Sequence, residues 1–167
     1  MIFGQPFEFA VFYELLEKTD DEYWKFGVFM FFIEDEIYPS KGSNYTLSMA
    51  VDYLKNTHQE VIDSQDEGLD MSMTAHALLK ELAHSHGMLL DCDPDDIELP
   101  DSKKIGVFLS PLEIADTGFY LFYCLGNNQV EYLIYSHDYG STAKKTILNK
   151  GTVSSVLEKL PCKESIY

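Results

Sequence analysis

Apolar and polar positions alternate near the start of the chain. Over residues 7–13, apolar side chains occupy every second position, which is the period of a strand with one buried face. Residues 27–33 are apolar at both parities, as expected for a strand at the centre of a sheet. The acidic triplet 34–36 then predicts a tight turn, followed by a short returning strand at residues 37–38.

Helical spacing is clearest from Ser72 or Thr74 to His86, where apolar side chains recur at intervals of three and four. Gly87 stands where a helix commonly places its C-terminal glycine. Residues 46–55 fit both a helix and a strand, and we favour the helix. A short final helix is expected from Thr152, which we predict as its N-cap, to a stop at Pro161.

Four further segments are rich in β-branched and aromatic residues and are predicted as strands: 105–109, 119–125, 130–135 and 143–148. The Gly-Asn-Asn sequence between the second and third of these predicts a hairpin turn. Strands therefore dominate both ends, with helices in the middle and at the C-terminus. This pattern predicts an α+β fold with a mainly antiparallel sheet and about three helices. A length of 167 residues agrees with a single domain over 1–167.

The charge of the chain restricts which partners it can bind. The chain has 28 acidic residues, 12 lysines and no arginine, for a net charge of −16. Direct nucleic-acid binding is disfavoured, because it uses Lys and Arg to replace the counterions of phosphates. Residues 1–101 hold 22 acidic residues and 5 lysines, so they carry the net charge. Such a surface serves either solubility or the attraction of a basic protein partner.

The acidic residues cluster in three places. Residues 91–96 are reminiscent of a calcium loop, but Asp96 stands where that loop requires glycine and Pro94 stiffens the chain. We therefore interpret the clusters as solvated segments and as candidate partner-binding residues: Asp20, Asp21, Glu22, Asp63, Asp66, Glu67, Asp70, Asp91, Asp93, Asp95 and Asp96.

The sequence gives little sign of catalysis. His76, Lys80 and His84 share one face of the predicted helix, but neither they nor His86 have a recognised metal-ligand spacing. We also find no phosphate-binding glycine loop and no nucleophile elbow. We expect a protein that is not an enzyme and has no cofactor, no metal and no catalytic residues. A small acidic metal-dependent hydrolase using His76 and His84, and an acidic protein-binding adaptor, remain as alternatives.

The cysteines and the apolar segments bear on the compartment. Cys92, Cys124 and Cys162 are odd in number and widely spaced, which predicts reduced thiols. The longest apolar run, residues 27–33, is too short to span a bilayer, and the N-terminal residues lack a basic leader. We expect a cytoplasmic protein with no membrane partner.

Trp24 and Gly27 precede the central apolar segment. We expect both in the core or in a tight turn that leads into the strand, away from any partner surface. If the indole is buried, Trp24→Ala would lower the free energy of unfolding by about 3–5 kcal/mol.

Turn and core positions at both ends of the chain resemble a known family. They are the opening GQPFEFA at residues 4–10, Trp24 with Gly27, the strand around Ile33 followed by Pro39, and the closing LNKGTV at 148–153. In these positions the chain is similar to bacterial immunity proteins of polymorphic toxin systems, and specifically to immunity protein family 42. It departs from the family pattern in having Gln in place of an acidic residue after the first glycine.

The resemblance implies a small cytoplasmic protein that binds the toxic C-terminal domain of a contact-dependent growth inhibition effector or a related secreted effector. Such a protein would cover the active or substrate-binding site of the toxin, and it would need no catalytic residue. Many such toxins are nucleases, whose phosphate-binding surfaces are basic. An inhibitor rich in Asp and Glu would complement such a surface.

Overall fold

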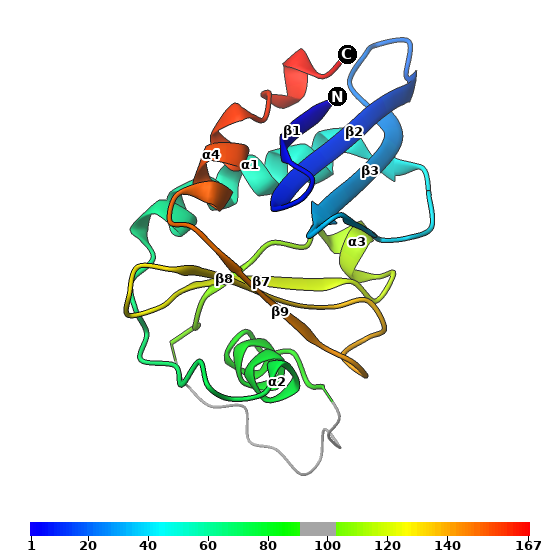
Figure 1. The fold of residues 1–167 in the computed structure, drawn as a ribbon. Helices are drawn as coiled ribbons and strands as arrows, with labels where there is room; N and C mark the ends of the chain where they lie inside the picture. The colour runs from blue at the N-terminus through cyan, green and yellow to red at the C-terminus, as the bar shows by residue number, and fades with distance from the viewer. Residues whose placement is uncertain (91–102) are drawn as a thin grey trace.

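The computed structural model of the chain describes residues 1–90 and 103–167. Two antiparallel sheets lie one above the other in Figure 1, with α1 and α4 beside the upper sheet and α2 below the lower one. The two ends of the chain lie together at the top. The first sheet consists of β1 (Ile2–Gln5), β2 (Phe9–Lys18), β3 (Lys25–Ile33), β4 (Glu36–Tyr38) and β5 (Tyr45–Thr46).

The remaining elements form the second sheet and the helices. The second sheet consists of β6 (Val107–Phe108), β7 (Tyr120–Leu125), β8 (Glu131–Ser136) and β9 (Lys144–Leu148). The helices are α1 (Leu47–Asp63), α2 (Ala75–Ser85), α3 (Leu112–Ala115), α4 (Thr152–Lys159) and the short 3₁₀ helix η2 (Lys163–Ser165).

The main core lies between the two sheets and against α1 and α4. Inward side chains of β2 and β3 alternate with outward ones, as the period of a strand requires. At the junction of the sheets, Tyr38 stacks on Phe119 with ring centroids 5.1 Å apart, and Phe31 lies 5.6 Å from the same ring. The buried residues of this core include Phe9, Val11, Phe29, Leu47, Val51, Leu54, Leu121, Leu133, Val153 and Leu157.

A second apolar cluster covers the opposite face of the second sheet. Phe122, Cys124 and Ile134 point away from the main core and pack against α2, which contributes Leu78, Leu79 and Leu82. The second sheet is therefore covered on both faces, which explains why β8 is buried at nearly every position.

The predicted fold class is confirmed. The structure is α+β and antiparallel, and its described part holds three helices of eight or more residues besides the single turn of α3. The ambiguous segment 46–55 is helical from Leu47 onward and forms the first half of α1, whereas Thr46 ends β5. Thr74 caps α2 by accepting from the Ala77 amide at 3.2 Å. The predicted tight turn is present but consists of Glu34 and Asp35 alone, with positive φ at both (51° and 69°), as in the tight turns that join antiparallel strands. Glu36 already belongs to β4.

Several details differ from prediction. There are two sheets, and β1 and α3 were not predicted. The strand predicted from residue 7 is β2, and it begins at Phe9. Phe7 lies in the turn between β1 and β2 and is 74% exposed. Thr152 is the first residue of α4, and the N-cap is Gly151, whose φ of 87° favours glycine. Within 105–109 only Val107 and Phe108 pair as a strand.

Gly27 is in the core, as predicted. A methyl group at this position would lie 1.9 Å from the Glu14 carbonyl oxygen and 2.8 Å from Leu47 Cδ1. Gly27→Ala should therefore lower the free energy of unfolding by about 1–3 kcal/mol, because backbone must move to admit it. Gly42→Ala is the control, since nothing lies within 4 Å of a methyl group there. Urea denaturation measures both, and equal midpoints would contradict the close approach.

Candidate functional site

The first acidic cluster, Asp20, Asp21 and Glu22, lies at the tip of the β2–β3 hairpin and is fully exposed to solvent. The Thr19 amide donates to the Trp24 carbonyl at 3.0 Å and closes this tip. Hydrogen bonds from the Thr19 hydroxyl and from a backbone amide lower the pKa of Asp21. An ion pair with Lys18 lowers the pKa of Glu22. Asp21 and Glu22 are therefore ionised at neutral pH.

The second acidic cluster, Asp63 to Asp70, begins at the last residue of α1 and continues into the segment that leads to α2. Asp66 accepts from the Gly68 amide at 2.9 Å, and Asp70 accepts from the Ser72 amide at 3.0 Å. These bonds are Asx turns, which hold the carboxylates in place outside any helix or strand. Hydrogen bonds from Ser72, the largest influence, lower the pKa of Asp70.

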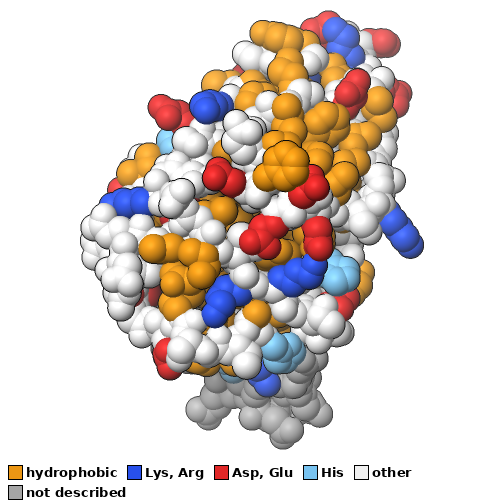
Figure 2. Space-filling model, in the orientation of Figure 1, with side chains coloured by type: hydrophobic (Ala, Val, Ile, Leu, Met, Phe, Trp, Pro, Cys, Tyr) orange, Lys and Arg blue, Asp and Glu red, His pale blue; other side chains and the backbone are white. Residues whose placement is uncertain are grey.

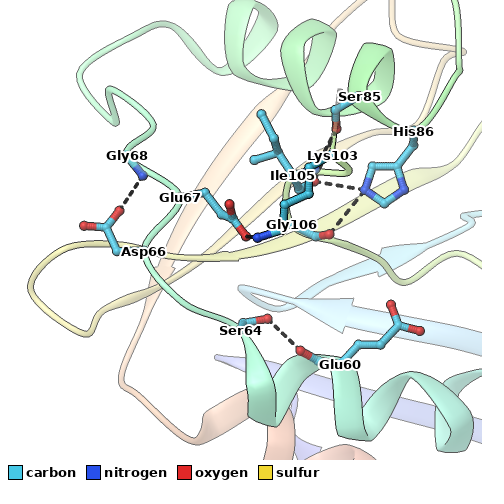
Figure 3. A network of polar contacts seen from close by, with 10 residues as sticks. All are labelled: Glu60, Ser64, Asp66, Glu67, Gly68, Ser85, His86, Lys103, Ile105 and Gly106. Carbon is cyan, nitrogen blue, oxygen red and sulfur yellow. Dashed lines mark hydrogen bonds and ion pairs between the residues drawn. The ribbon is translucent and has the colours of Figure 1, made fainter. Parts of the chain in front are cut away.

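A cleft of about 340 Å³ opens beside the second cluster. One wall carries Glu60, Asp63 and Glu67, and the other carries His86 and Lys103. Figure 3 shows Glu67 paired across the cleft with Lys103, at 3.4 Å between carboxylate oxygen and Nζ. The side chain of this lysine is 82% exposed, and a surface pair of this kind is weak, so the charges of the cleft remain available to a partner.

His86 has a structural position at the back of this cleft. Its Nε2 lies 2.9 Å from the Ile105 carbonyl oxygen and 3.2 Å from that of Gly106 (Figure 3). Two carbonyl acceptors require a proton on that nitrogen, and burial lowers the pKa of the ring, so the neutral form is favoured. His86 therefore ties the end of α2 to the start of β6.

The other predicted chemistry is not assembled in the described part of the chain. His76 is exposed on α2, and the Nε2 of His84 is buried with no hydrogen-bond partner there. Residues 1–90 and 103–167 contain no group of three or more His, Cys, Asp or Glu side chains that could hold a metal ion. Asp91, Asp93, Asp95, Asp96 and Cys92 lie outside the described residues.

The two described clusters lie at opposite ends of α1. Ser48 and Met49, at its first turn, border the hairpin tip, and Asp63 is its last residue. A 17-residue helix is about 25 Å long, so the clusters are separated by roughly that distance. A standard interface covers about 800 Å² on each partner. A round patch of that area is about 30 Å across, so one partner reaches both clusters only if its interface runs along the length of α1.

Trp24 lies in the turn before β3, the second of the two predicted places, and its indole is not buried. Its side chain is 41% exposed and packs edge-on against Tyr23, with ring centroids 5.0 Å apart. Together with Met49 and Asp52 these rings line a hollow of about 430 Å³. Aromatic and Met side chains beside carboxylates are typical of the centre and rim of protein interfaces. In the sequence, the adjacent Tyr23 and Trp24 are the only sign of this exposed aromatic site. Whether they are exposed depends on where the hairpin ends, which the sequence does not show.

Trp24→Ala should change the free energy of unfolding by less than about 1 kcal/mol, because an exposed indole loses few core contacts. Phe29→Ala is the control. Phe29 is fully buried on the inner face of β3, and its loss should cost about 3–5 kcal/mol. Thermal or urea denaturation of both variants measures the difference. A loss at Trp24 as large as that at Phe29 would show that the indole is buried in solution.

The chain is similar to a known protein family and to a solved structure. The family model described as immunity protein 42 matches residues 1–162. An uncharacterized protein of Pasteurella multocida (strain Pm70) is 29% identical over 170 residues, covering 96% of this chain and 99% of the relative. The crystal structure of CdiI from Burkholderia dolosa AUO158 matches with a TM-score of 0.74 at 20% identity, covering 95% of this chain and 96% of that one. No helix of the described residues is long and apolar enough to cross a membrane.

Proposed function

We propose that this chain, which belongs to the immunity protein 42 family, binds a cognate toxin domain and neutralises it by covering its active or substrate-binding site. The observation that carries the proposal is the family match over residues 1–162, which is nearly the whole chain. The toxin is the C-terminal domain of a contact-dependent or other secreted effector. Binding is stoichiometric, and the chain acts in the cytoplasm, without catalysis.

The charge of the chain supports a basic toxin. The net charge is −16, and two separate acidic clusters are exposed at the ends of α1. A nuclease must present Lys and Arg to the phosphates of its substrate. Carboxylates that occupy that surface exclude the substrate by both charge and volume. We therefore propose that the toxin is a nuclease and that the candidate acidic residues, those at 91–96 included, attract it.

Co-expression tests the proposal directly. The toxin domain encoded immediately upstream of this chain's gene is expressed in a sensitive host, alone and together with this chain. Growth should be restored only by co-expression, and the purified proteins should form a complex of fixed stoichiometry. An immunity protein from an unrelated toxin pair is the control. Rescue by the unrelated protein, or rescue without a complex, would contradict neutralisation by specific binding.

The purified toxin tests the proposal that it is a nuclease and that this chain inhibits it by stoichiometric binding. Its cleavage of DNA and RNA is measured against increasing amounts of this chain. Activity should fall linearly to zero at the stoichiometric point, as in tight binding. Inhibition far below that ratio would indicate catalytic inactivation of the toxin. A toxin that acts on no nucleic acid would remove the nuclease part of the proposal and leave neutralisation standing.

A further inference from the structure

The outer face of the first sheet is apolar and uncovered. Because α1 and α4 pack on the inner face of this sheet, the opposite face looks outward. β3 has alternating burial, fully buried inward and partly buried outward, yet its outward side chains are also apolar. Antiparallel sheets with one solvated face normally place polar side chains there. In Figure 2 hydrophobic side chains gather over β2 and β3.

Strand register defines the members of this face. Ile2, Phe12 and Met30 stand opposite one another across β1, β2 and β3, and Phe32 stands opposite Ile37 on β4. Ile2 is 49% exposed, Ile37 42%, and Leu16 at the bulge of β2 63%. We call these residues and Val28 the open face: Ile2, Phe12, Leu16, Val28, Met30, Phe32 and Ile37. Contiguous exposed apolar side chains of this kind mark interaction sites.

Acidic residues surround the open face. Glu14 stands opposite Val28 on the same side of the sheet, and Glu34 and Asp35 form the turn at the end of β3. Residues 1–38 contain nine acidic residues and two lysines. Of these lysines, Lys25 is buried and donates to backbone carbonyls of residues 163 and 164, and Lys18 pairs with Glu22. At the β4 border, Lys144 of β9 pairs with Glu36. The acidic residues still outnumber these lysines, so the rim is negative.

This rim restricts what can cover the open face. Nucleic acid and anionic lipid headgroups are repelled by it. A second copy would bring another charge of −16 and would oppose one acidic rim to another. What remains is a protein surface with an apolar centre and Lys or Arg around it. The acidic hairpin tip continues β2 and β3 beyond the open face and extends the same negative border.

We propose that the open face, bordered by Glu14 and the hairpin tip, is the surface that holds the cognate toxin domain. This inference rests on the proposed function and adds where the toxin binds. The apolar centre supplies the contacts that slow dissociation, and the acidic border pairs with basic residues of the toxin. The Asp63–Asp70 cluster, at the far end of α1, contributes to attraction but not to the packed contact.

The test uses substitutions that remove apolar contact without adding charge. Leu16→Thr/Ile37→Thr places β-branched residues, which suit a strand, at both positions. Ile62→Thr is the matched control, because Ile62 is 54% exposed on α1, which packs on the inner face of the sheet. Binding of each variant to the upstream-encoded toxin domain is measured by surface plasmon resonance. We expect the double variant to bind about 10-fold or more weakly, mainly through faster dissociation, and the control to bind as wild type. Thermal denaturation of each variant shows that it is folded.

Hydroxyl-radical footprinting gives a second readout on the unaltered protein. Oxidation of Phe12, Met30 and Ile37 should fall in the complex, and oxidation of Ile62 should not. If the wild type binds the toxin but the double variant binds equally well and the open face stays unprotected, the inference is wrong and the proposed function stands. If the wild type binds no toxin, both the inference and the proposed function are wrong. A wild-type dimer in analytical ultracentrifugation that the double variant abolishes would assign the face to self-association and overturn the inference.

Discussion

Glu131→Ala is expected to lower the free energy of unfolding by about 3–5 kcal/mol, although Glu131 is a charged residue in a strand. Its side chain is only 2% exposed. One carboxylate oxygen accepts from the Gly151 amide at 2.7 Å, and the other accepts from the Val153 amide at 3.0 Å. The Tyr123 hydroxyl also donates to it at 3.3 Å. Removing the carboxylate leaves these donors without their acceptor.

Glu131 also explains how α4 begins. Gly151, the N-cap of α4, has no side chain to accept from the first helical amides, and Glu131 supplies the acceptor from β8. Its negative charge lies at the positive end of the helix dipole. Because α4 contributes Val153 and Leu157 to the main core, losing this contact affects packing as well as hydrogen bonding.

Glu131→Gln is the matched control for this prediction. It keeps the size of the side chain and one carbonyl acceptor but removes the charge, so we expect a smaller loss than for alanine. Urea denaturation followed by circular dichroism measures both variants. Equal losses for Gln and Ala would show that the charge, not the acceptor geometry, stabilises α4. A loss under 1 kcal/mol for Ala would contradict the capping role.

Period and turn chemistry are enough to predict most of this fold. The hairpin at 126–128 follows from its Gly-Asn-Asn sequence, and the Gly126 amide does donate to the Val130 carbonyl at 2.9 Å. β1 could not be predicted, because its four residues are too few for a period and Gly4 interrupts them. α3 is a single turn after Pro111, and a helix of that length has no stripe to detect. Neither the hydrophobic period nor the turn residues predict that the strands divide into two sheets.

The site depends on information that is not local. The apolar positions of β3 on both parities predicted a central strand, which is confirmed, but they do not show which face of the sheet the helices cover. Which face a helix covers is decided by long-range packing, so the open face appears only in three dimensions. In the same way, Trp24 is exposed because the hairpin ends there. The acidic clusters can be recognised in the sequence as groups of Asp and Glu. Their separation by the length of α1 can be recognised only in the structure.

Reversing the described acidic clusters should slow association with a basic toxin by about 10-fold or more, within the range that electrostatic steering provides. One variant changes Asp20, Asp21 and Glu22 to Lys, and another changes Asp63, Asp66, Glu67 and Asp70 to Lys. Neutral counterparts with Asn and Gln are the controls, and Asn at 66 and 70 also keeps the Asx turns. Stopped-flow binding at several salt concentrations measures the rates. A third variant, Asp93, Asp95 and Asp96 to Lys, completes the set.

Combining the first two variants tests whether the clusters act separately. They lie about 25 Å apart along α1, and the screening length is about 8 Å at physiological ionic strength but about 30 Å at 0.01 M. At physiological salt their effects on the association rate should therefore multiply, and at low salt they should overlap. Dissociation should respond to reversal of the hairpin tip more than to reversal of the Asp63–Asp70 cluster, because only the tip borders the open face. If the association rate changes neither with salt nor with any of the charge reversals, the charge serves solubility and the toxin is held by apolar contact alone.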